Sequence, residues 1–293
     1  MIAPALLANR ERYERTMEGW CDNTDEDVFT HTVRLEDPAR AVELEVVAEP
    51  SPSYAIRAAH LRCLRGDVSA GSASGVASLG GMAMVAGFTR RVAEATGGGA
   101  GAALVVDAAI EAARLARQVA KLPRERAERA AGNPWEAWHL DRSGWVDLPD
   151  SCFTYSAAGR ALLETRTVST PMQADLYSPR PGQRRVFERR KVARLERRAD
   201  RLVLFHAMHD NVHGFDLTYE IDATSGRIER ADSVITRLPY AGICSEPQGR
   251  IHALVGEVVD AELSRRIQIL LGGPSGCAQL YDLTADLLKL LRG

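Results

Sequence analysis

Hydrophobic and polar residues alternate with a period of two through much of residues 186–236, which is the pattern of half-buried β-strands. Phe215, Leu217 and Tyr219, for example, alternate with Asp216 and Thr218. Residues rich in Asp, Ser and Gly separate the runs and favour turns. The pattern predicts an antiparallel meander of four strands, at residues 186–195, 202–209, 214–221 and 227–236.

After Pro239 the spacing of the hydrophobic positions changes to that of amphipathic helices. Leu280, Leu283, Leu287 and Leu290 recur at helical spacing. A Gly-Gly-Pro sequence at 272–274 ends the preceding helix, because Pro lacks a backbone donor and Gly favours helix ends. We predict helices at 250–258, 261–271 and 276–291. Four strands followed by about three helices that cover one sheet face predict an α+β fold.

An internal repeat relates the two ends of the chain. With an offset of 175, residues 79–115 align without a gap with residues 254–290, and eleven of the 37 positions are identical. Unrelated sequences would share about two or three. The identical positions in the first segment are Leu79, Gly81, Ala86, Arg90, Arg91, Gly97, Gly98, Gly101, Ala103, Asp107 and Leu115.

The repeat continues upstream with offsets that fall from 174 to 172, as changes in loop length would produce. Arg15 corresponds to Arg189 at 174, the alternation at 42–46 to that at 215–219 at 173, and Ile56 to Ile228 at 172. We therefore predict two tandem copies related by a pseudo-twofold axis, at about residues 10–120 and 183–293. The predicted domains are a degenerate first copy at 1–121, a connector at 122–181 and a second copy at 182–293.

The connector carries three of the four tryptophans, Trp135, Trp138 and Trp145. A disordered linker is not expected to be rich in aromatic residues. We expect an ordered segment that packs across both copies. The alternative interpretation is that these tryptophans line a ligand groove.

Composition limits the functional classes. The 293 residues are 45% hydrophobic and 26% charged, with a net charge of −2, so no overall charge favours nucleic acid or membrane surfaces. The basic run at 184–201 is interspersed with acidic residues, and alternation would place its long side chains outward. The uncharged stretch at 68–89 is too rich in Gly, Ala and Ser for a membrane span. Five cysteines without a CxxC motif favour a reducing, cytoplasmic location.

No P-loop, GxSxG or HExxH motif is present, and the glycines at 97–101 follow a predicted helix, which favours a turn between helices over a dinucleotide site.

Most reactive side chains lie in the second copy. Cys277 lies at a predicted helix N-terminus, where the helix dipole favours a thiolate. The first copy lacks the equivalents, since Cys277 aligns with Ala102. The reactive residues of the second copy are His206, His209, Asp210, His213, Asp216, Cys244 and Cys277.

Four segments of the second copy form a recognisable series: HDNVHGFDLTYEIDATSGRIERAD, LPYAGIC, LVG and LLGGPSGCAQLYDL. On these segments the chain, from Asp210 to its end, resembles an uncharacterised bacterial family, the domain of unknown function numbered 2889. At residues 276–280 the family has Gly-Cys-Thr-His-Leu. This chain has Ala278 and Gln279 in place of the Thr and the His. The resemblance implies no known activity. The positions that fit the family are His213, Pro239, Tyr240, Cys244, Gly276, Cys277 and Leu280.

The order of elements is also similar to that of iron–sulfur scaffold proteins, whose ligands lie before a strand, after the last strand and at a later helix. His213, Cys244 and Cys277 occupy comparable places. Mixed His and Cys ligands would suit zinc or an iron–sulfur cluster. This predicts a metal-binding scaffold or accessory protein. The structural alternative is that these are buried or turn residues without chemistry.

Two other functions are open. One is an enzyme that acts on a small molecule in a cleft between the copies, with Cys277, His213, Asp210 and Tyr240 as candidate catalytic residues. The other is a non-catalytic interaction module, which predicts neither a metal nor a reactive thiol. The expected partner of the protein is a small molecule or a protein. No feature of the sequence specifies the oligomeric state.

Overall fold

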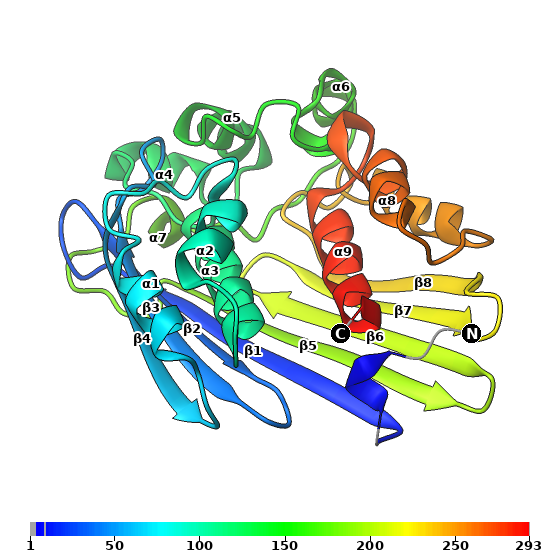
Figure 1. The fold of residues 1–293 in the computed structure, drawn as a ribbon. Helices are drawn as coiled ribbons and strands as arrows, with labels where there is room; N and C mark the ends of the chain where they lie inside the picture. Colours follow the sequence, from blue (N-terminus) through cyan, green and yellow to red (C-terminus); the bar gives the residue numbers. More distant parts are fainter. Residues whose placement is uncertain (1–3, 9, 293) are drawn as a thin grey trace.

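The computed structural model describes residues 4–8 and 10–292. Its centre is an eight-stranded antiparallel sheet in the order β4-β3-β2-β1-β5-β6-β7-β8 (Figure 1). β1 pairs antiparallel with β5, so the meanders of the two halves form a continuous sheet. The strands are β1 Arg12–Asp22, β2 Phe29–Glu36, β3 Ala41–Ala48, β4 Ile56–Arg65, β5 Phe187–Arg198, β6 Arg201–Asp210, β7 Gly214–Asp222 and β8 Ile228–Arg237.

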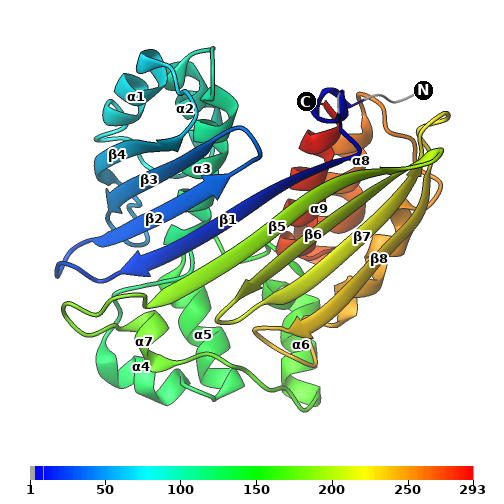
Figure 2. The same cartoon turned by 90° about the horizontal axis from the view of Figure 1, so that it is seen from below.

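The mixed α+β class and the four strands expected at 186–236 are confirmed, and each strand end lies within three residues of its prediction. Helices cover one face of the sheet, and Figure 2 shows the other face without helices. The α-helices are α1 Ala70–Ala77, α2 Phe88–Thr96, α3 Ala102–Ala116, α4 Arg124–Ala130, α5 Pro134–Gly144, α6 Ala157–Thr165, α7 Ala174–Tyr177, α8 Leu263–Leu271 and α9 Ala278–Arg292.

The α-helix expected at 250–258 is instead a 3₁₀-helix, η3 Glu246–Leu254. Gly249 in this segment disfavours an α-helix, because Gly loses more backbone entropy than other residues when a helix forms. The turn between α2 and α3 is as predicted, with Gly97, Gly99 and Gly101 all at positive φ. In the described part of the chain no helix is both long and apolar enough to span a membrane.

Two apolar clusters lie between the sheet and the helices. One is formed by β1–β4, α1–α3 and the connector, and the other by β5–β8, η3, α8 and α9. In the second cluster Leu280, Leu283 and Leu287 of α9 are fully buried, which agrees with their helical spacing.

The strand registers of the two halves correspond residue by residue. β3 and β4 pair irregularly at Ala41/Val42 and at Val47/Ala48, and β7 and β8 do so at Gly214/Phe215 and Glu220/Ile221. Each irregularity in the second half lies 173 residues after its counterpart, since 41 becomes 214 and 47 becomes 220. This offset is the one that the sequence alternation predicts for β3 and β7.

The basic run on β5 differs from its prediction. Arg189 and Lys191 point inward and are 1% and 6% exposed. Arg189 pairs with Asp210, and Lys191 pairs with Glu111 of α3 and Asp286 of α9. The expectation that alternation would place these charges outward is wrong at both positions, because acidic partners from other segments neutralise them inside.

The connector is ordered and contacts both halves. The backbone N–H of Ala120, at the end of the first half, donates to Leu176, and Ser169 pairs with Ala241 after β8. Phe153 donates a backbone hydrogen bond of 2.8 Å to Gly276, just before α9. These contacts place the connector helices across one end of the sheet (Figure 2).

Candidate functional site

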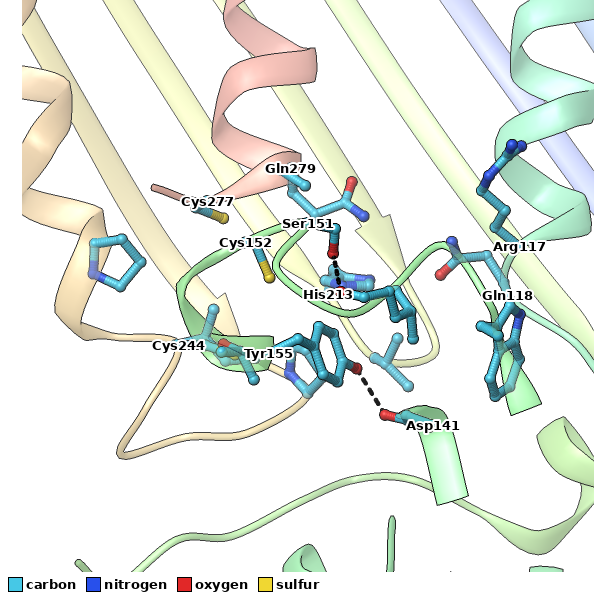
Figure 3. Close-up of a pocket in the computed structure, with 18 of the residues that line it drawn as sticks. Arg117, Gln118, Asp141, Ser151, Cys152, Tyr155, His213, Cys244, Cys277 and Gln279 are labelled. Carbon is cyan, nitrogen blue, oxygen red and sulfur yellow. Dashed lines mark hydrogen bonds between the residues drawn. The ribbon is translucent and has the colours of Figure 1, made fainter. Parts of the chain in front are cut away.

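A pocket of about 140 Å³ lies where the end of α3, the connector and the second half meet (Figure 3). Arg117 and Gln118 border it from the first half, and Asp141 and Trp145 border it from the connector. The second half supplies the turn between β6 and β7, the segment after β8 and the start of α9. Among the second-half residues that line the pocket are His213, Phe215, Cys244, Cys277 and Gln279.

Asp210 and His213 form the main polar contact in the second-half wall. Both lie at the β6–β7 turn, where Asp210 Oδ1 accepts backbone hydrogen bonds from Val212 at 2.8 Å and His213 at 2.6 Å. His213 Nδ1 is 3.1 Å from each Asp210 oxygen. On the other side, Arg189 Nη2 lies 2.7 Å from Asp210 Oδ2. The turn therefore fixes the imidazole through one buried carboxylate.

The charge on Asp210 decides the tautomer of His213. Burial alone would raise the pKa of Asp210, but His213 and Arg189 outweigh it and hold that pKa well below its usual range. An ionised carboxylate only accepts hydrogen bonds, so Nδ1 of His213 must be the donor. The neutral imidazole then carries its lone pair on Nε2. A histidine oriented in this way by a carboxylate is suited to act as a general base.

A second polar group lies in the connector wall. Asp141 is fully buried, and its Oδ2 accepts a 2.7 Å hydrogen bond from Tyr155 and another from Tyr240. Burial raises the pKa of Asp141 to about 6, although the two tyrosine hydroxyls oppose this shift. Tyr240, predicted as a catalytic candidate, thus supports Asp141. Figure 3 shows Asp141 and Tyr155 joined by their hydrogen bond, with His213 in the same pocket.

Burial raises the pKa of each cysteine in the pocket wall. Cys277 precedes the first residue of α9, as expected, but burial raises its pKa and outweighs the backbone hydrogen bonds that would lower it. This direction is opposite to the one that the helix N-terminus predicts for the Cys277 pKa. Cys244 Sγ is 2.9 Å from Thr154 Oγ1, and burial also raises its pKa. Cys152, which we did not predict, lines the same pocket, and burial raises its pKa to about 11.

The predicted metal ligands share the pocket but do not form a ligand set. Within residues 4–8 and 10–292, no group of three or more His, Cys, Asp or Glu side chains is arranged to hold a metal ion. His213 Nδ1 is engaged by Asp210, and Cys244 contacts Thr154. The expectation of zinc or an iron–sulfur cluster at His213, Cys244 and Cys277 is not supported by this geometry.

The remaining candidates lie outside the pocket. His206 is buried, its Nδ1 is 2.9 Å from the carbonyl oxygen of Leu283, and burial lowers its pKa to about 4. His209 pairs with Asp216 at 2.9 Å on the exposed side of the sheet. Sequence reasoning missed Asp141 and Tyr155, because both come from the connector. The cluster of tryptophans there was the available signal, and Trp145 does line the pocket.

Comparison with known proteins matches part of the second half to a protein family. Residues 194–291 match the family model described as "Protein of unknown function (DUF2889)". No curated protein and no solved structure matches the chain. The matched segment contains His213, Cys244 and Cys277 and leaves the first half and the connector outside it. The second half of this chain is therefore similar to that family of unknown function.

Proposed function

We propose that the protein is an enzyme that removes a proton from a small organic substrate, or from a water that attacks it, in the pocket between the two halves. His213 is the general base, and Asp210 is the positioning residue that orients it. The observation that carries the proposal is the contact of His213 Nδ1 with both oxygens of the buried Asp210 carboxylate. It leaves Nε2 of a pocket-lining histidine as an acceptor.

Two further features support an enzyme over the alternatives. The pocket joins segments from the first half, the connector and the second half, which is the kind of concave, mainly apolar site that small molecules occupy. The buried Asp210 carboxylate that holds the base is itself paired with Arg189, so the orientation of His213 is supported by a second buried contact. A metal scaffold would need a ligand set that the described residues lack.

The test is a panel of small ketones, aldehydes and esters, scored for deuterium incorporation in D₂O and for hydrolysis. We expect His213→Gln to lower the rate for any active compound by about 10²–10⁴-fold, the usual contribution of a general base. His209→Gln is the matched control, since His209 also pairs with an aspartate but lies outside the pocket. An H213Q protein as active as the wild type would contradict the proposal.

We also propose that the two halves arose by tandem duplication. The equal offset of the pairing irregularities supports it, as do ion pairs between α3 and α9. Arg114 pairs with Asp282 at 3.1 Å, and Lys289 pairs with Asp107 at 2.9 Å. Since Asp107 and Arg114 align with Asp282 and Lys289 in the repeat, the two pairs exchange under the predicted pseudo-twofold axis. On this proposal the first half supports a site that the second half carries.

A further inference from the structure

Two residues at the end of α5 contribute to the pocket wall. Asp141 lies in the last turn of α5, and Trp145 directly follows the helix with an extended backbone. Trp145 donates its backbone N–H to the carbonyl oxygen of Asp141 at 2.9 Å, which fixes the two residues relative to each other. Both residues line the pocket.

Each of these side chains keeps one buried polar atom without a partner. Asp141 and Trp145 are 2% and 3% exposed, and neither Asp141 Oδ1 nor Trp145 Nε1 has a hydrogen bond. The other oxygen of Asp141 is occupied by Tyr155 and Tyr240. A buried donor or acceptor left unpaired destabilises a protein, so such atoms call for a ligand or an ordered water. Here one unpaired donor and one unpaired acceptor belong to two residues of the same pocket wall.

The rest of the wall is mostly apolar and bounds the size of an occupant. A cavity of about 150 Å³ accommodates a benzene-sized molecule, and this pocket is close to that volume at about 140 Å³. The occupant therefore needs a compact hydrocarbon part. The apolar side chains of the wall include Leu148, Met172, Leu176, Val212, Phe215 and Leu238.

The unpaired atoms select among functional groups. A hydroxyl both accepts, from the indole N–H, and donates, to the carboxyl oxygen. A carboxylate ligand would face Asp141 with like charge, and an ammonium group could not accept from Trp145. A hydrocarbon would leave both protein atoms unpaired.

We propose that Trp145 Nε1 and Asp141 Oδ1 form a recognition site for the hydroxyl group of a small, mainly apolar alcohol or phenol. This recognition site rests on the proposed function, because the molecule that occupies the pocket is taken to be the substrate of the proposed enzyme. The hydroxyl at this wall orients the molecule, and its hydrocarbon part extends toward His213. The substrate class is thus narrower than "small organic molecule".

The test uses the indole N–H signals of the full chain labelled with ¹⁵N-tryptophan. Four signals are expected from four tryptophans, and Trp145→Phe assigns one of them. Phenol and cyclohexanol are the probes, and toluene, benzoate and benzylamine are the comparison compounds. We expect saturable shifts of the Trp145 signal with the hydroxyl probes, and binding about tenfold weaker for toluene, which lacks the hydroxyl.

Variants separate recognition from folding. Trp145→Phe and Asp141→Asn should each lower the affinity for phenol several-fold, and Trp145→Phe should leave that for toluene unchanged. Trp135→Phe is the matched control, because Trp135 is 41% exposed and is absent from the pocket wall. Equal affinities for phenol and toluene, or a Trp145 signal that no probe moves, would overturn the inference and leave an ordered water as the partner.

The outcome is distinguishable from failure of the proposed function. His213→Gln should still bind phenol, since its side chain is not part of the recognition pair. Phenol binding without any His213-dependent turnover would keep the recognition site and reject the general base. Turnover that depends on His213 but does not select for a hydroxyl group would keep the general base and reject the recognition site.

Discussion

Both carboxylate oxygens of Asp210 lie 3.1 Å from Nδ1 of His213, while Arg189 holds the same carboxylate from the other side. Asp210→Asn removes the charge and leaves Arg189 buried without a counter-ion. We expect the free energy of unfolding, measured in urea, to fall by about 3–5 kcal/mol. Asp216→Asn, which breaks the exposed His209 pair, should change it by about 1 kcal/mol or less. Similar losses for D210N and D216N would contradict the assigned role of the buried carboxylate.

Acid should weaken the Asp210 contact. Because the folded-state pKa of Asp210 is lowered, its stabilisation is complete above the unfolded-state value, about 3.9. It is lost progressively as the pH falls below that value toward the folded pKa. Unfolding free energies of the wild type and D210N, measured between pH 5 and pH 2, should converge at the acid end. A constant difference over this range would show that Asp210 is not preferentially ionised in the folded protein.

Asp141 should have the opposite pH dependence. Its folded pKa of about 6 lies above the unfolded value, so the folded protein binds more protons between about pH 4 and 6. Stability should therefore decline as the pH rises through this window, by about 3 kcal/mol in total. Asp141→Asn should remove this decline, and the exposed Asp27→Asn should retain it. A D141N protein with the wild-type pH profile would show that the shift belongs to another group.

The buried ammonium group of Lys191 should stabilise the contact between the halves. Lys191 Nζ lies 2.8 Å from Glu111 of α3 and 3.2 Å from Asp286 of α9. Lys191→Met leaves both acids with less compensation, and we expect unfolding free energy to fall by about 3–5 kcal/mol. Arg190→Met, whose exposed partner is Glu18, should cost about 1 kcal/mol or less. Adding Glu111→Gln to K191M should restore part of the loss. If the double variant is less stable than K191M, the result would contradict charge compensation between Lys191 and Glu111.

Thiol reactivity should follow burial. Cys63 is exposed, whereas Cys21 and Cys244 are buried and their pKa values are raised by that burial. With a chromogenic disulfide reagent at neutral pH, we expect Cys63 to react fast and the half-buried Cys152 and Cys277 to react slowly. Cys21 and Cys244 should react only on unfolding. Cys63→Ser should abolish the fast phase. A fast phase that survives C63S but disappears in Cys277→Ser would restore Cys277 as a reactive thiol.

The sequence by itself determined the local structure of the second half. Period-two alternation located β5–β8, because one face of each strand is buried, and the leucine spacing located α9. The glycines at 97–101 identified a turn, since positive φ is readily adopted only by glycine. His213, Cys244, Cys277, Asp210 and Tyr240 were identified by residue type, and the structure places them in or next to one pocket.

Only the tertiary structure decided what those residues can do. The protonation of a thiol or a carboxyl group depends on burial and on neighbours from distant segments. A helix N-terminus suggested a thiolate at Cys277, yet desolvation prevails there. In the sequence Arg189 is one residue of a basic run, whereas in the structure it pairs with Asp210. Asp141 has no distinguishing pattern around it in the sequence, because its partner Tyr240 lies 99 residues later. Local patterns therefore locate elements, whereas contacts between distant residues set their chemistry.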